Sequence, residues 1–127
     1  MAKIQIQNDK SNDLTIIEVS GDVTLKEIIA TVQRYYANNP THALIWDFSK
    51  TDSIQLDLGG LEHIVDIIKA FIASRPHGRT AFVKSKQVNA GLASLFKGFA
   101  GVSGLPYEYR ICSSREDALD WINQMVY

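Results

Sequence analysis

The chain of 127 residues carries 13 basic and 14 acidic side chains, and 46% of its residues are hydrophobic. This balance is typical of one globular domain, excludes a disordered chain and gives no general electrostatic attraction to nucleic acid. One cysteine allows no intrachain disulfide, and no apolar run resembles a signal peptide or a membrane span, so we expect a cytoplasmic protein without stable membrane insertion.

The N-terminal segment predicts a β-hairpin. Residues 3–7 alternate polar and apolar side chains, which is typical of a half-buried edge strand. The turn-rich residues 8–13 then return the chain into a second strand over 14–19. The pair Gly21-Asp22 is expected to end that strand.

A helix and a buried strand follow the hairpin. Thr24 and Glu27 have the spacing of a capping box, and the helix that they begin should end before Pro40. The unbroken apolar run over 43–46, which stops at Asp47, indicates a strand that is covered on both faces.

The second half of the chain predicts alternating helices and strands. Residues 49–53 form a polar connector, which we expect to be a loop. A strongly amphipathic helix begins near Gly59-Gly60 and runs to about Phe71, and residues 75–78, Arg-Pro-His-Gly, break it. The remaining predicted elements are a strand over 80–83, a helix over 88–98, a half-buried strand over 107–112 and a helix capped by Ser113 or Ser114.

Together these elements predict an α/β protein with one domain over residues 1–127. Its sheet is mixed and five-stranded, with an N-terminal hairpin and four helices. Because alternating strands lie at sheet margins and continuous apolar strands lie in the middle, the first and fifth strands should be the edges. Right-handed crossovers make the later strands parallel.

Two motifs resemble the STAS domain, the module of sulfate transporters and anti-sigma-factor antagonists. Residues 20–24, Ser-Gly-Asp-Val-Thr, resemble its turn before the first helix. Residues 44–49 and 57–61 resemble its aspartate-ended strand and the start of its next helix, and the closing segment 113–122 is similar to a SpoIIAA-like branch. The resemblance implies the STAS fold and a non-catalytic regulatory module that binds a protein partner.

One position departs from this family. In the antagonist members, a partner kinase phosphorylates the serine just before the helix glycine. Gly59 stands at that position here and has no hydroxyl group, so the usual phosphorylation switch is not expected. Ser53 and Thr51 are the nearest hydroxyl groups, and both are also ordinary turn residues.

The carboxyl end of the central strand is the predicted binding surface, because ligands and partners of α/β sheets bind there. This surface contains no histidine, no cysteine and no phosphate-loop lysine, so we predict no catalytic residue and no cofactor. We call it the rim, and its residues are Ser49, Thr51, Asp52, Ser53, Asp57, Gly59 and Gly60.

An alternative hypothesis is a carrier or sensor of a lipid, an acyl chain or another small apolar ligand. The glycine-rich segment 88–106 has only one charged residue, which suits either a mobile flap over a pocket or a helix and buried loop packed on the sheet. The apolar contacts would be Leu92, Leu95, Phe96, Phe99, Val102 and Leu105, and Lys84, Lys86 and Lys97 would meet an anionic group.

Other polar residues give no further site. His42, His63 and His77 lack metal-ligand spacing, so no metal is expected. Cys112 is predicted on the polar side of an edge strand without a neighbouring base. We therefore favour the interaction module, with the apolar carrier as the alternative and self-association left open.

Overall fold

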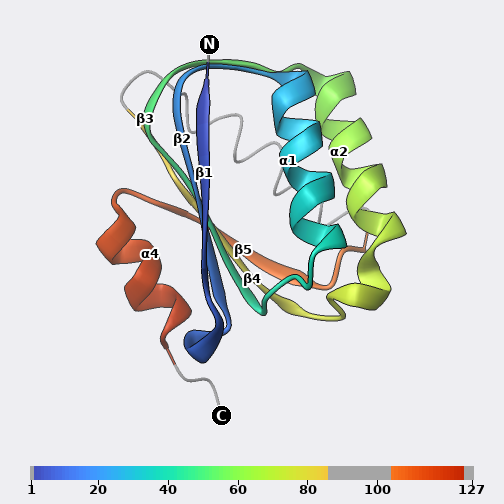
Figure 1. The fold of residues 1–127 in the computed structure, drawn as a ribbon, viewed down its shortest axis with the longest axis vertical. Helices are drawn as coiled ribbons and strands as arrows, with labels where there is room; N and C mark the ends of the chain where they lie inside the picture. The colour runs from blue at the N-terminus through green and yellow to red at the C-terminus, as the bar shows by residue number, and fades with distance from the viewer. Residues whose placement is uncertain (1, 86–103, 125–127) are drawn as a thin grey trace.

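The computed structural model describes residues 2–85 and 104–124, and its centre is one five-stranded sheet. The strand order β1-β2-β3-β4-β5 confirms that the first and fifth strands are the edges, with β1 antiparallel to β2 and the other neighbours parallel (Figure 1). The strands are β1 (Lys3–Asp9), β2 (Leu14–Thr24), β3 (Ala43–Gln55), β4 (Gly78–Val83) and β5 (Tyr107–Cys112).

Helices cover both faces of this sheet. α1 (Leu25–Ala37) and α2 (Leu58–Ala70) lie side by side on one face, and α4 (Arg115–Ile122) lies on the other (Figure 1). Short 3-10 turns, η1 (Lys10–Asn12) and η2 (Ile72–Ser74), follow β1 and α2. The helix predicted over 88–98 falls outside the described residues.

Side chains at the first turns explain where the helices begin. The predicted capping box at α1 is present, since the Thr24 hydroxyl accepts from the Glu27 N–H and Glu27 accepts from the Thr24 N–H. Asp57 caps α2, and Ser114 accepts from the Asp117 N–H at α4. Each cap satisfies an N–H group that has no partner within its helix.

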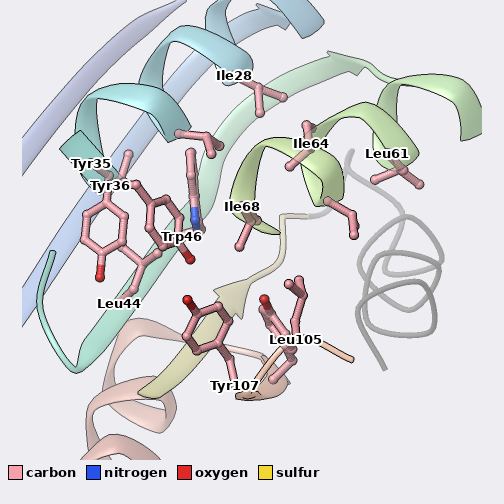
Figure 2. Close-up of a cluster of buried hydrophobic side chains, with 14 of the residues drawn as sticks. Ile28, Tyr35, Tyr36, Leu44, Trp46, Leu61, Ile64, Ile68, Leu105 and Tyr107 are labelled. Atoms are coloured by element: carbon pink, nitrogen blue, oxygen red, sulfur yellow. The ribbon is translucent and has the colours of Figure 1, made fainter. Parts of the chain in front are cut away.

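The two faces of the sheet form two apolar cores, and β3 contributes to both. Leu44 and Trp46 pack under α1 and α2, whereas Ala43 and Ile45 pack under α4. This double burial is the physical reason for the continuous apolar run in β3. Figure 2 shows the larger core, whose labelled side chains are Ile28, Tyr35, Tyr36, Leu44, Trp46, Leu61, Ile64, Ile68, Leu105 and Tyr107.

Two sequence predictions about strand ends were wrong. β2 continues past Gly21, which takes a φ of 81° between two register shifts, so the glycine bends the strand instead of ending it. The polar connector over 49–53 lies in the second half of β3, where residues 50–55 pair with residues 20–24 of β2. Sequence alternation did not reveal this pairing, because the register shifts break its period of two.

A buried arginine joins the amino-terminal ends of β3 and β4. Arg75 is only 2% exposed, and its guanidinium lies 4.4 Å from the ring centroid of Tyr107. Its Nε donates to the Thr41 carbonyl at 3.0 Å, and Nη2 donates to the His42 and Arg79 carbonyls at 2.9 and 3.0 Å. Nη1 donates to the Tyr36 and Thr80 hydroxyl groups, both at 3.1 Å.

These five hydrogen bonds use all five N–H donors of the guanidinium. Gly78 fits beside them only because it has no side chain, since a Cβ there would lie 2.3 Å from the His42 carbonyl oxygen. The sequence indicated Arg75 and Gly78 only as residues that break a helix, and nothing in its pattern identified the arginine as part of the core.

Candidate partner-binding surface

The start of α2 forms one exposed part of the rim. Asp57 holds this turn, because its Oδ1 accepts a 2.7 Å hydrogen bond from the Gly60 N–H. The next residue, Leu58, is 54% exposed and is the one exposed large apolar side chain in residues 2–85 and 104–124. The result is an apolar group presented to solvent from a capped, hydrogen-bonded turn.

The two rim glycines have different surroundings. Gly60 is buried, and a Cβ there would lie 3.0 Å from both terminal methyl groups of Leu25. Gly59 is exposed, and a Cβ there would meet only the Asp57 carboxylate at an ordinary 3.7 Å. A side chain at position 60 would therefore force Leu25 to shift by a few tenths of an ångström, whereas position 59 has room for a side chain.

The strand residues of the rim divide between surface and interior. Ser49, Asp52 and Ser53 are exposed, and the Ser53 hydroxyl donates at 2.7 Å to the carboxylate of Asp22 on the neighbouring strand β2. Thr51 is buried, and its hydroxyl donates to the Val19 carbonyl at 2.8 Å. Its prediction as a surface residue was wrong, because this side chain turns inward beside the register shifts between β2 and β3.

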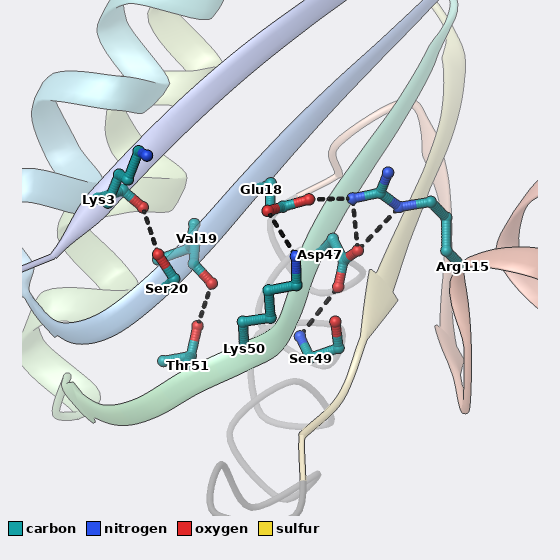
Figure 3. A network of polar contacts seen from close by, with 9 residues as sticks. All are labelled: Lys3, Glu18, Val19, Ser20, Asp47, Ser49, Lys50, Thr51 and Arg115. Carbon is teal, nitrogen blue, oxygen red and sulfur yellow. Dashed lines mark hydrogen bonds and ion pairs between the residues drawn. The ribbon is translucent and has the colours of Figure 1, made fainter.

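A polar network borders the rim on the α4 face of the sheet (Figure 3). Arg115 bonds to Asp47 through Nε at 2.9 Å and through Nη2 at 2.8 Å, and it bonds to Glu18 at 2.5 Å. Lys50 lies 3.2 Å from the other Glu18 oxygen, and the Ser49 N–H donates to Asp47 at 2.9 Å. The network ties the first turn of α4 to β2 and β3.

The charges of this network are matched. Burial alone would raise the pKa of the Asp47 carboxyl, but hydrogen bonds from Ser49 and Arg115 outweigh it, so the pKa lies below the ordinary value. Hydrogen bonds from Arg115 and then Lys50 also lower the pKa of Glu18. Both carboxylates are thus held in the charged form by neighbouring cations, an arrangement that fixes structure.

Sequence reasoning missed this network. Asp47 was recognised as the end of an apolar run, and its burial at 3% exposure is the reason that it needs a cation. Arg115 lies 68 residues further along the chain, so no local pattern connects the two. The one available signal was an aspartate directly after the apolar run over 43–46.

The described residues also line a small apolar cavity between α1, α2 and the sheet. Its volume is about 80 Å³, well below the ~300–1,000 Å³ of typical ligand pockets. Leu105, one of the predicted ligand contacts, is buried in the larger core. Lys84 is exposed; the other predicted contacts, Leu92, Leu95, Phe96, Phe99, Val102, Lys86 and Lys97, lie outside the described residues.

The histidines and the cysteine are not among the rim residues. His42 and His77 have ring centroids 5.3 Å apart and are exposed, as is His63 on α2. No group of three or more metal-binding side chains occurs among the described residues. Cys112 is buried against α4, which corrects its predicted polar placement, and burial raises the pKa of its thiol.

The exposed rim can therefore bind through apolar contact, carboxylates and hydroxyl groups. In the part of the chain that the structure describes, no helix is both long and apolar enough to cross a membrane.

Comparison with known proteins defines the fold. No protein-family model matches the sequence, and no curated protein matches it. Solved structures do match, and they give the chain a SpoIIAA-like fold of the STAS type. The resemblance inferred from the two motifs is confirmed at the level of the fold.

Three structures illustrate this match. The anti-sigma factor antagonist SpoIIAA in its unphosphorylated form has a TM-score of 0.61 at 15% identity, over 97% of this chain and 100% of that one. An anti-sigma factor antagonist from Mycobacterium paratuberculosis has a TM-score of 0.55 at 13% identity, over 98% and 96%. A protein with a SpoIIAA-like fold from Shewanella loihica has a TM-score of 0.53 at 16% identity, over 95% and 93%.

Proposed function

We propose that this protein is a non-catalytic, regulatory interaction module that binds a protein partner through the rim and Leu58. The exposed Leu58 carries the proposal. A leucine that stays 54% exposed has not gained the ~1.5–3 kcal/mol that its full burial would supply, and a partner can supply that burial. The solved antagonists with this fold support a regulatory role by analogy.

The local geometry favours binding a folded partner without rearrangement. The Asp57 cap and the close contact of Gly60 with Leu25 fix the turn that presents Leu58. A preformed contact loses little conformational entropy on binding, so more of its burial energy appears as affinity. The exposed Asp57 precedes this apolar group in the chain and the rim also carries the exposed Asp52, so the carboxylates suit a partner that carries basic residues.

The proposed module is not switched by phosphorylation at position 59. SpoIIAA has been solved in an unphosphorylated and in a phosphorylated form, whereas Gly59 offers no hydroxyl group to a kinase. Ser53 is exposed, but its hydroxyl already donates to Asp22. Binding of the proposed partner is therefore constitutive, or it is regulated through another part of the protein.

The apolar carrier is the weaker hypothesis. An acyl chain needs several hundred cubic ångströms, and the described cavity provides about 80 Å³. It would have to enlarge by separating helices from the sheet, which costs apolar contacts.

Leu58→Gln is the direct test of the interaction module. Bait protein carrying this change should lose at least about tenfold in affinity for the partner that native protein captures from its own cells, because the leucine contact is removed. Ala70→Gln is the matched control, since Ala70 is also exposed on α2 but at its opposite end. Equal capture by native protein and both variants, measured by quantitative mass spectrometry, would refute the proposal.

A further inference from the structure

β1 is an open edge of the sheet. Within residues 2–85 and 104–124 it pairs with β2 on one side and with no strand on the other, and all seven of its residues pair with β2 without a register shift. Lys3, Gln5 and the segment 7–9 are exposed, and the strand contains neither proline nor glycine. Edge strands of this kind present unpaired backbone N–H and C=O groups to any strand that can align with them.

The charges of β1 are complementary to those of a second copy. Lys3 and Asp9 stand at its two ends, and the residues between them are uncharged. In an antiparallel pair centred on Ile6, Lys3 of each copy lies opposite Asp9 of the other copy. Gln5 of each copy lies opposite Gln7 of the other. A parallel in-register pair would instead set each charge against its own kind, which is unfavourable.

The apolar side of the strand fits the same alignment. Ile4 and Ile6 are half-buried and pack on the core shared with α1. In the pair centred on Ile6, the two Ile6 side chains meet and Ile4 of the second copy lies opposite Asn8. At that point there is a hollow of about 410 Å³, whose described lining is Ile6, Asn8, Arg34, Tyr35 and Asn38.

We propose that two copies of this chain associate through antiparallel β1 strands paired about Ile6, which joins the two five-stranded sheets into one. The helices α1 of both copies then lie on the same face. The two rims lie at opposite ends of the joined sheet, because the strands of the two copies run in opposite directions. Such a dimer presents two binding surfaces and gains avidity for a partner with two contact points.

The expected dimer is weak. Two paired seven-residue strands bury less than the ~1,200 Å² of a standard stable interface, so dissociation constants in the micromolar-to-millimolar range are expected. The charge contacts form at an exposed edge. Both oxygens of Asp9 already accept hydrogen bonds in the turn, from Ser11 and from the Asn12 side chain.

Charge substitutions at Gln5 and Gln7 test the proposed register. Gln5→Lys with Gln7→Lys places like charges opposite each other at both 5:7 pairs, so sedimentation equilibrium should show at least a tenfold weaker dimer. Gln5→Lys with Gln7→Glu places opposite charges there and should keep or strengthen it. Both positions are exposed in the monomer, so thermal unfolding should change little.

Disulfide trapping provides an independent measurement, in a Cys112→Ala background. Directly opposed residues in antiparallel strands have Cα atoms ~4.5–5.5 Å apart, a distance that a disulfide spans. Mixed Gln5→Cys and Gln7→Cys proteins should therefore cross-link to each other under mild oxidation more than either does to itself.

Three results would overturn the proposal. They are a protein that stays monomeric up to about 1 mM, a dimer that both charge variants leave equally strong, and Gln5→Cys that cross-links mainly to itself, which would centre the pair on Gln5. None of these results affects the test at Leu58, which lies on α2, so failure of the dimer and failure of the interaction module are separate outcomes.

Discussion

Replacing Arg75 with lysine should destabilise the protein severely, although the substitution keeps the charge. The guanidinium makes five hydrogen bonds inside the core. A lysine ammonium has three donors on a flexible stem and cannot reproduce the planar arrangement. At least two acceptors lose their bond to the cation, while the buried charge remains.

The structure limits how large the loss can be. The Thr41 carbonyl also accepts from the Tyr35 hydroxyl at 2.8 Å, and the His42 carbonyl also accepts from the Arg79 N–H at 3.0 Å. Neither carbonyl is therefore left without a donor. With ~1.5–3 kcal/mol for each lost bond to a charged group, we expect the free energy of unfolding to fall by about 3–5 kcal/mol.

This loss can be measured by urea unfolding at neutral pH, with the midpoint and the slope fitted separately. For 127 residues, a decrease of 3–5 kcal/mol lowers the melting temperature by roughly 10–20 °C. Arg34→Lys, at an exposed position on α1, is the control and should change the free energy by no more than ~0.5 kcal/mol. A loss below ~1 kcal/mol for Arg75→Lys would show that the five-bond arrangement does not stabilise the fold as argued.

Two further substitutions test the rim and the polar network. Gly60→Ala should lower the free energy of unfolding by about 1–3 kcal/mol, because its Cβ would lie 3.0 Å from the Leu25 methyl groups, whereas Gly59→Ala should be neutral or slightly stabilising. Equal effects in urea unfolding would contradict this contrast. Asp47→Asn should cost about 1–3 kcal/mol near pH 7, since it removes the carboxylate from Arg115. The folded-state pKa of Asp47 lies below its ordinary value, so this stabilisation is present above that value and is lost as the pH falls through the folded-state pKa. The native and Asn proteins should therefore converge in stability at strongly acid pH, and a difference that does not depend on pH would refute the assignment.

The sequence determined the local structure and the order of the elements. Thr24 with Glu27 and Asp57 with Gly60 fix helix starts through hydrogen bonds between close neighbours in the chain, and short-range patterns of this kind can be read directly. The apolar run over 43–46 likewise predicted a central strand, because burial on both faces leaves no polar position. These patterns were sufficient to predict which strands lie at the edges of the sheet and to predict the α/β class.

The structure of the rim differs in part from its prediction. The exposed turn at Asp57 and Gly59 was anticipated, whereas the neighbouring loop proved to be strand and Thr51 proved to be buried. Leu58 was part of the matched motif, but its exposure depends on which face of α2 meets the core. Helix rotation is set by packing against α1 and the sheet, which sequence spacing constrains only loosely.

Only the tertiary structure determined the contacts between residues that are far apart in the chain. Arg75 reads as a helix breaker, yet it joins the starts of two strands. Arg115 reads as an ordinary first-turn residue, yet it neutralises Asp47 across 68 positions. A buried charge selects its partner by proximity after the chain has folded, and distance along the sequence carries no information about that proximity. The sequence thus specified which elements form, and the folded arrangement specified which polar groups hold them together and which surface remains open for binding.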